Sequence, residues 1–391
     1  MNDFLTPKQL ELKERARAIA DGIVRQVSAK HDRDQTYPWE VQEALKNANL
    51  CGVWIPKEYG GEGGGVLDLC LVVEQLSRAC GGVGVAYAVN ALGSFPIILA
   101  GTEEQKKKFL PDIAAGKKLI AFGLSEKEAG SDAGSMKTRA VKEGDHYVLN
   151  GEKKWNTGGL VAATNTVFCV TNPERGSRGI SALLVEDGTP GYRKGKEEDK
   201  MGIRCVPVIE VHFENCKVPA ENLLGGREGL GFKDAMMTLD RARPGVAAQA
   251  LGLAQGAFEL AVDYTRKRQQ FGQSVASFQG VSWMFADMGT QIEAARQLVY
   301  HAARVIDSGS KSISKISAMC KLMATDTAMK VTTDCVQLFG GYGYVKDYPI
   351  EKYMRDAKIT QIYEGTNQVQ RLVIAREILR EAASSREGES K

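Results

Sequence analysis

Near its C-terminal end the chain reads Ile362-Tyr363-Glu364-Gly365-Thr366-Asn367-Gln368. This stretch predicts a short polar turn directly before a last amphipathic helix. Two segments precede it, Tyr353-Met354-Arg355-Asp356-Ala357-Lys358-Ile359 and the glycine-rich Phe339-Gly340-Gly341-Tyr342-Gly343-Tyr344. A Glu in a turn is more often solvated than catalytic. The rest of the chain therefore has to supply the context for Glu364.

Three regions of different texture follow one another along the chain. Residues 1–117 carry helical stretches between turn signals, and the first begins with Thr6 as a cap and Pro7 in the first helical position. Residues 118–227 carry short β-rich runs between clusters of Gly, Asn, Asp and Pro, which predicts strands and turns, including a hairpin around 143–145. Residues 228–391 return to long helices. The predicted fold class is therefore α+β.

The last region repeats apolar residues three or four positions apart, which is the spacing of one helix face. Segments of about 30 residues with such seams predict an antiparallel bundle. The residues predicted to face inward are Ala247, Ala250, Leu251, Ala254, Phe258 and Ala261; Val281, Phe285, Met288, Ile292, Ala295, Val299 and Ala302; and Ile316, Met319 and Met323.

Composition disfavours several classes of function. The formal charge of +3, from 51 basic and 48 acidic residues, is too small for a nucleic-acid surface. The 4 His are scattered, which disfavours a zinc site or a Ser-His-Asp triad, so no metal is predicted. The 8 Cys form no Cys-x-x-Cys pair and are interpreted as buried reduced thiols. We expect no apolar run of the roughly 18 residues that a membrane helix needs, and no targeting segment is expected either. The sequence therefore predicts a soluble intracellular protein.

Together, the three C-terminal segments resemble the signature of the acyl-CoA dehydrogenase family, and related motifs occur in all three regions. The resemblance implies an N-terminal α-helical domain (1–117), a middle β-barrel-like domain (118–227) and a C-terminal four-helix bundle (228–391). In the family, the Glu of the Tyr-Glu-Gly-Thr turn is the base that removes a proton next to a thioester carbonyl. Glu364 is therefore the implied catalytic residue. Some subfamilies place the base on an earlier helix, where this chain has Ala242.

Two segments of the middle region resemble the family's flavin-binding segments and imply FAD as cofactor. The first is Ala121-Phe122-Gly123-Leu124-Ser125-Glu126 with Ala129-Gly130-Ser131-Asp132, and the second spans 151–159. Hydroxyl and backbone N–H groups suit the ring edge on which charge grows during reduction. The implied contacts are Phe122, Leu124 and Ser125 at the pyrimidine side, Ser131 at the pyrophosphate, Trp155 near the ring and Thr157 near flavin N5.

The chain departs from the family pattern near these segments. Lys127-Glu128 stand where the family usually has Pro-Gly, and Val206-Pro207-Val208 is more apolar than in many members. Asn156 and Gly158 replace an Ile and an Asn. Since the resemblance puts these two residues beside the ring, they are expected to bear on substrate shape or partner access.

The last region carries further implied contacts. Arg268 and Phe271, with Gln337 and Gly341, match residues that bind FAD across a subunit interface, so a homo-oligomer, and specifically a tetramer, is expected. The remaining implied contacts are Thr366 and Gln368 to the FAD phosphates, and Ser131, Asp240, Arg243, Tyr363 and Gly365 to the acyl-CoA.

The resulting hypothesis is FAD-dependent dehydrogenation of an acyl-CoA to a 2,3-enoyl-CoA, with electrons passed to electron-transferring flavoprotein. The acyl group is expected to be short, branched or cyclic, and segment 81–100 offers no Arg to pair with a second carboxylate. Two alternatives stay open: an enoyl-CoA reductase or oxidase on the same fold, or a non-catalytic CoA- or flavin-binding assembly factor. The expected location is the bacterial cytoplasm, or the mitochondrial matrix for a processed eukaryotic form.

Overall fold

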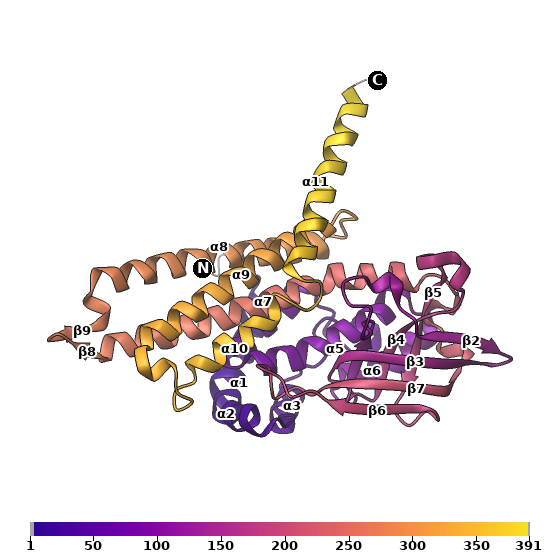
Figure 1. The fold of residues 1–391 in the computed structure, drawn as a ribbon, viewed down its shortest axis with the longest axis horizontal. Coiled ribbons are helices and arrows are strands. Elements are labelled where there is room, and N and C mark those ends of the chain that lie inside the picture. Colours follow the sequence, from indigo (N-terminus) through magenta and orange to yellow (C-terminus); the bar gives the residue numbers. More distant parts are fainter. Residues whose placement is uncertain (1–3, 390–391) are drawn as a thin grey trace.

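The computed structural model describes residues 4–389 and contains a helical, a β-rich and a second helical region in chain order (Figure 1). The predicted fold class, α+β with a middle β domain between helical domains, is confirmed. Its sheet is curled. The predicted boundaries at 117/118 and 227/228 lie in the connecting segments between elements.

The described part of the first region, from residue 4 onward, contains six α-helices. Thr6 caps the first of them, because its hydroxyl accepts a hydrogen bond from the backbone N–H of Gln9, and Pro7 begins the helix as predicted. A π-helical turn at Ala20–Val24 joins the first two. The helices are α1 (Pro7–Ile19), α2 (Arg25–Asp34), α3 (Trp39–Asn47), α4 (Val66–Ala79), α5 (Gly81–Ala100) and α6 (Glu103–Ala114).

The middle region is one seven-stranded sheet with the order β1-β4-β2-β3-β7-β6, in which β5 pairs with β4. The predicted hairpin is the β2–β3 pair, and Gly144 in its turn has φ 61°. The other β-rich runs of this region also form strands, as predicted. The strands are β1 (Ile120–Gly123), β2 (Arg139–Glu143), β3 (His146–Thr157), β4 (Thr164–Val170), β5 (Ile180–Glu186), β6 (Tyr192–Glu197) and β7 (Val208–Pro219).

The last region packs long helices against one another, and its final helix projects away from the body (Figure 1). A two-residue-strand hairpin, β8 (Gln269–Gln270) with β9 (Gln273–Ser274), lies at the far end of α7. The helices are α7 (Gly231–Lys267), α8 (Gln279–Asp307), α9 (Ser314–Phe339), α10 (Ile350–Thr360) and α11 (Asn367–Glu389).

The predicted inward face is correct for α7 and α8, apart from the part-buried Phe258, Val281 and Phe285, but wrong for α9. In α9, Ile316 and Met319 are only part-buried and Met323 is 37% exposed. The buried stripe runs instead through small residues and one charged residue. Small side chains allow α9 to pack closely against α7, so volume rather than hydrophobicity selects this face. The buried stripe consists of Ser317, Cys320, Lys321, Ala324, Thr325 and Ala328.

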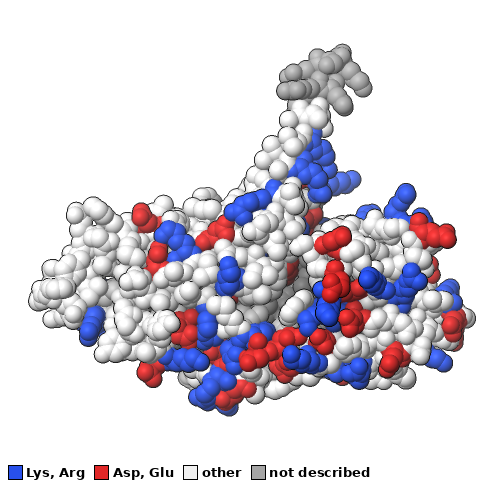
Figure 2. Space-filling model, in the orientation of Figure 1, with Lys and Arg blue, Asp and Glu red and all other residues white. Residues whose placement is uncertain are grey.

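The expectation that no apolar run reaches membrane-spanning length was also wrong. Helices α5 and α7 are each long and apolar enough to cross a membrane by length and composition alone. In each, 72% of the apolar window is buried inside the protein, as in the core helix of a globular fold. All 8 Cys are free and buried, as predicted. In Figure 2, basic and acidic side chains are interspersed along the lower part of the face shown.

Hydrogen bonds from α5 attach the β-rich region to the first helical region. The Asn90 side-chain oxygen accepts from the backbone N–H of Ile120 at the start of β1 (3.1 Å). The Thr166 hydroxyl of β4 donates to the carbonyl of Gly93 (3.0 Å). Since both α5 residues are buried, these contacts are shielded from water and fix the edge of the sheet on the helix.

Helices α4 and α7 approach closely at glycines of α7. A Cβ added at Gly256 would lie 2.1 Å from the carbonyl oxygen of Arg78. We therefore expect Gly256→Ala to lower the free energy of unfolding by about 1–3 kcal/mol, because the helices cannot separate without losing other contacts. Gly280→Ala in α8 is the matched control, since nothing lies within 4 Å of its added Cβ. Equal effects of the two substitutions in chemical denaturation would contradict this packing account.

Candidate active site

Glu364 lies in the turn between α10 and α11 and adopts a left-handed backbone conformation. Its φ is 52°, and Gly365 follows with φ 86°. For a residue with a Cβ this conformation costs about 1–2 kcal/mol, so neighbouring contacts must hold it. Gln370 in α11 donates to the carbonyls of Glu364 (3.2 Å) and Gly365 (2.8 Å), and the Tyr363 hydroxyl donates to Gln249 in α7. The turn is thus fixed on both sides of Glu364.

The Glu364 carboxyl is in an unusual electrostatic environment. Its Oε2 is buried without a hydrogen-bond partner within the described chain, although the residue as a whole is only part-buried. Burial raises the pKa of Glu364 to about 7, against the opposing charges of Lys321 and Arg243. A carboxylate with a pKa near neutrality is suited to accept a proton as a general base.

Asp240 and Arg243, predicted to contact the substrate, lie on α7 near this turn. The Arg243 guanidinium is buried and donates to Asp240 Oδ1 (2.6 Å). Asp240 also accepts from the hydroxyl of Ser314 (2.5 Å). Burial lowers the pKa of Arg243, while the charges of Asp240 and Glu364 oppose that shift. Arg243 is therefore electrostatically coupled to Glu364.

An apolar cluster connects the Glu364 turn to the second flavin-like segment. Tyr363 packs against a small core that includes Val85 of α5 and Val206. The next residue, Pro207, accepts a hydrogen bond from the backbone N–H of Gly158 (2.7 Å). Gly158 has φ 73°, and a Cβ there would lie 3.3 Å from Val89 of α5. The apolar 206–208 segment and Gly158 thus bring the β-rich region close to α5 and Tyr363.

The two flavin-like segments lie next to each other. The backbone N–H of Lys154 in β3 donates to the carbonyl of Ser125, which follows β1 (2.9 Å). Trp155 has φ 63° and is 56% exposed. Leu124 is buried in the core, whereas Phe122 is part-buried. Within residues 4–389, the hydroxyls of Ser125, Ser131 and Thr157 have no hydrogen-bond partner. An exposed aromatic face beside unpaired hydroxyls fits the ring and polar edges of a flavin.

A buried ion pair that the sequence analysis missed supports these segments. Lys153 is fully buried and its ammonium lies 2.8 Å from Glu126 Oε1. The Glu126 carboxylate also accepts the backbone N–H groups of Lys137 (2.6 Å) and Thr138 (2.9 Å). Burial opposes ionisation, but Lys153 and these hydrogen bonds outweigh it and hold the Glu126 pKa below its usual value. The pair therefore fixes the loop that carries Ser125 and Ser131.

Asn156 does not border the flavin-like surface through its side chain. Asn156 is buried, donates to the carbonyl of Phe122 (3.2 Å) and exchanges hydrogen bonds with Asn165 of β4 (3.2 and 3.0 Å). An Ile could make none of these bonds. Asn156 thus joins β1, β3 and β4, and its effect on any bound ring is exerted through the backbone.

Four of the predicted cofactor residues lie elsewhere. Arg268, directly after α7, and Phe271, in the β8–β9 hairpin, are exposed, and Figure 1 shows this hairpin at the end of the molecule opposite the β-rich region. Gln337, near the C-terminal end of α9, and Gly341, directly after α9, are also exposed. Phe271 is 93% exposed. One protomer does not bring these residues to the flavin-like segments. Thr366 and Gln368 lie at the start of α11, where the Thr366 hydroxyl accepts from the N–H of Val369 (3.2 Å).

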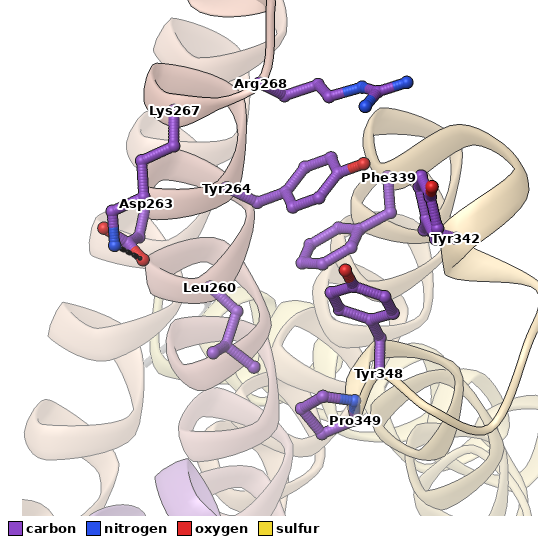
Figure 3. Close-up of a pocket in the computed structure, with 9 residues that line it drawn as sticks. All are labelled: Leu260, Asp263, Tyr264, Lys267, Arg268, Phe339, Tyr342, Tyr348 and Pro349. Carbon is purple, nitrogen blue, oxygen red and sulfur yellow. Dashed lines mark hydrogen bonds and ion pairs between the residues drawn. The ribbon is translucent and has the colours of Figure 1, made fainter.

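A cavity of about 460 Å³ lies beside Arg268 and was not predicted (Figure 3). Tyr264 and Phe339 stack in it with ring centroids 4.1 Å apart, and the Arg268 guanidinium lies over the Tyr342 ring. Arg268 is the one predicted site residue among its lining residues. The acidic and basic residues that line this cavity, Asp263 and Lys267, are exposed and pair with each other (2.7 Å). The carboxyl of Glu364, whose Oε2 is buried without a partner in the described chain, is therefore the better marker of the reaction site.

The chain matches three family models that together cover most of its length. Residues 6–117 match the acyl-CoA dehydrogenase N-terminal domain, residues 121–216 the middle domain and residues 229–379 the C-terminal domain. A short-chain-specific acyl-CoA dehydrogenase of Clostridium acetobutylicum is 48% identical over 97% of this chain and 100% of that relative. An acryloyl-CoA reductase (NADH) of Anaerotignum propionicum is 46% identical over 97% and 96% of the two chains.

Two solved structures are similar over nearly the whole chain. One is butyryl-CoA dehydrogenase from Megasphaera elsdenii, with a TM-score of 0.93 and 45% identity over 96% of this chain and 99% of that chain. The other is a chain from a structure described as an electron transferring flavoprotein of Acidaminococcus fermentans. Its TM-score is 0.95 and its identity 49%, over 97% of this chain and 100% of that chain.

The Lys153–Glu126 pair predicts a coupled loss of stability. Lys153→Met leaves a buried carboxylate without its counter-ion and should cost about 3–5 kcal/mol of unfolding free energy, with loss of bound flavin. Glu126→Gln should be similarly harmful. Because each single substitution strands the other group, the double variant should lose less than the sum of the two. Additive losses in chemical denaturation would show that the pair does not act as a unit.

Proposed function

This chain belongs to the acyl-CoA dehydrogenase family, and we propose that it converts a short-chain acyl-CoA into its 2,3-enoyl-CoA with Glu364 as the base. The enzyme is an FAD-dependent oxidoreductase that acts on acyl-CoA. The observation that carries the assignment of the base is the Glu364 carboxyl on a left-handed turn, with its Oε2 buried and without a hydrogen-bond partner in the described chain. Because the pKa of this carboxyl is raised to about 7, a large fraction of it is ionised at neutral pH, and the carboxylate is basic enough to accept a proton.

Glu364 removes the proton on the carbon next to the thioester carbonyl. That proton is too weakly acidic for a free carboxylate to remove efficiently, so the developing enolate oxygen needs hydrogen-bond donors. Within the described chain, the backbone N–H of Glu364 makes no hydrogen bond. It is the donor we assign to the thioester oxygen. The strained turn therefore supplies both the base and a donor for the negative charge.

FAD, when bound, supplies the acceptor for the hydride that leaves the β-carbon. Trp155 presents an aromatic face to it, and Thr157 and Ser125 offer hydroxyls to its polar edge. Phe122, Leu124 and Ser131 continue that surface, with Thr366 and Gln368 at the N-terminus of α11, an end of a helix that favours phosphate. Arg268, Phe271, Gln337 and Gly341 would reach the cofactor of a second copy.

A short acyl chain is supported by two observations. Relatives at 48% and 45% identity are named for short-chain and butyryl substrates. The space between Gly158 and α5 is narrow, because a methyl group added at Gly158 would contact Val89. The absence of charged residues from 81–100 in the sequence argues against a substrate with a second carboxylate.

A second candidate function is reduction of an enoyl-CoA on the same site. A relative at 46% identity is named acryloyl-CoA reductase (NADH). The same residues would serve both directions, since Glu364 would return a proton to the α-carbon. The direction depends on the electron partner, which we propose to be electron-transferring flavoprotein, because a chain with a TM-score of 0.95 comes from a structure described by that name.

We further propose a homotetramer in the bacterial cytoplasm, or in the mitochondrial matrix if the source is eukaryotic. The exposed Phe271 supports an oligomer that completes each cofactor site from a second copy, since its β8–β9 hairpin lies at the end of the molecule away from the β-rich region (Figure 1). The 8 buried free thiols suit a reducing compartment.

Glu364→Gln is expected to keep FAD and fold but to abolish bleaching of the flavin by butyryl-CoA under anaerobic conditions. The wild-type bleaching rate should rise with pH through about 7, because only the carboxylate accepts a proton and its pKa is raised to that value. Lys358→Gln, at an exposed position of α10 close to the turn, is the control and should bleach like the wild type. Unchanged bleaching by the Glu364→Gln protein would exclude Glu364 as the base.

A panel of acyl-CoA substrates tests the proposed chain length. We expect butyryl-CoA to give a larger kcat/KM than octanoyl-CoA by at least about tenfold, a difference of about 1.4 kcal/mol in transition-state binding. Glutaryl-CoA should be the poorest. Comparable kcat/KM values for butyryl- and octanoyl-CoA would contradict the short-chain assignment without affecting that of the base.

A further inference from the structure

Lys321 is a buried charged residue that the sequence analysis did not single out. It lies on the core stripe of α9 and has no exposed surface. Its ammonium donates to the carbonyl of Gly365 and to the side-chain oxygen of Asn367, both at 2.9 Å. Gly365 belongs to the turn that carries Glu364, and Asn367 is the first residue of α11, directly after that turn. A fully buried Lys is rare and costly unless it is paired.

Asn367 makes further hydrogen bonds that join the start of α11 to α9. Its side-chain amide donates to Thr325 (2.9 Å) and to Asp326 (2.7 Å) of α9. The first turn of α11 is therefore tied to α9 by side chains on consecutive turns of that helix. Together with the Tyr363–Gln249 contact to α7, these bonds hold the chain directly before and directly after Glu364. A Glu in the left-handed backbone conformation persists only when several contacts around it hold the chain in place, as these do.

We infer that Lys321 is a positioning residue for the base: its ammonium holds the Glu364 turn through Gly365 and Asn367 and faces the carboxylate as a buried positive charge. The inference rests on the proposed role of Glu364 and adds a residue from α9 to that role. Lys321 does not touch the reacting carbon. It acts through the conformation and the ionisation of Glu364.

The charged and titratable groups around the pair come from three helices and the turn itself. Arg243 of α7 acts on both Glu364 and Lys321, Asp326 of α9 acts on Lys321, and Glu364 acts on Tyr363. Arg376 of α11 acts on Arg243. Burial lowers the pKa of Lys321 to about 7, with Glu364 opposing the shift, while burial raises the pKa of Glu364 to the same range. The two groups therefore titrate as a coupled pair near neutrality.

Lys321→Met tests the inference, because methionine keeps the length of the side chain but lacks the charge and the donors. Without the ammonium, the carboxylate loses a stabilising charge, so the Glu364 pKa should rise by about one unit or more. The pH dependence of flavin bleaching by butyryl-CoA should move to higher pH. At pH 7 the bleaching rate should fall about fivefold, because a rise of the pKa from about 7 to about 8 lowers the carboxylate fraction from about one half to about one tenth, and it should recover at alkaline pH.

Lys321→Arg and Lys330→Met are the matched variants. Arginine retains the charge, so the midpoint of the pH dependence of bleaching in Lys321→Arg should stay at or below that of the wild type. Lys330 lies on the same helix but is exposed and pairs with Asp334, so its loss should leave the profile unchanged. A readout without substrate is infrared titration of the Glu364 carboxyl in the holoenzyme, assigned by its absence in Glu364→Gln. That titration should show the same shift to higher pH in Lys321→Met alone.

Two results would overturn the inference. The first is a Lys321→Met profile that superimposes on the wild type. The second is a loss of activity that does not recover at any pH while the infrared titration stays in place, as expected for general damage. Failure of the proposed function looks different, since Glu364→Gln would then still bleach and would retain its pH profile. In that case the base lies elsewhere, whatever Lys321 does.

Discussion

The structure depends on holding one carboxyl group on a left-handed turn with one of its oxygens removed from water, although both the backbone conformation and the loss of hydration cost free energy. Glu364 has a left-handed backbone conformation and a buried, unpaired oxygen. Each feature costs free energy, and the fold offsets that cost with contacts from three helices. The Tyr363 hydroxyl binds Gln249 of α7, and the Gly365 carbonyl binds Lys321 of α9. The carbonyl of Glu364 itself binds Gln370 of α11. The long helices thus serve as the frame for one turn.

The segment before the turn is anchored just as firmly, which explains the residues of the 353–359 signature. Tyr353 donates to the carbonyl of Arg78 in α4 (2.7 Å), and Arg355 pairs with Asp32 of α2 (2.7 Å). Asp356 accepts the backbone N–H of Ile203 (2.6 Å) from the β-rich region. Helix α10 therefore touches all three regions of the fold. The position of Glu364 relative to the flavin-like surface follows from these contacts.

Much of this arrangement was predictable from local patterns. The Thr6 cap, the hairpin at Gly144 and the inward faces of α7 and α8 follow from turn chemistry and periodicity, and the structure confirms them. The inward face of α9 does not, because close packing selects Ser317 and Ala324 over Met319 and Met323. Lys321 gave no such signal, because the apolar spacing of α9 predicted the core on another face of that helix. The Arg268 cavity had none, since its rings come from residues far apart in the sequence. The contacts of Arg268, Phe271, Gln337 and Gly341 to a cofactor stay predictions, because they need a second copy.

The central claim, that Glu364 takes the α-proton, is tested most directly without hydride transfer. An acyl-CoA with sulfur in place of the β-carbon has acidic α-protons but no β-hydride to lose. Exchange of its α-protons with deuterium oxide, followed by NMR on the holoenzyme, reports proton removal alone. Wild-type protein should catalyse the exchange with a rate that rises through a pH of about 7, and Glu364→Gln should not. Equal exchange by both proteins would contradict the account.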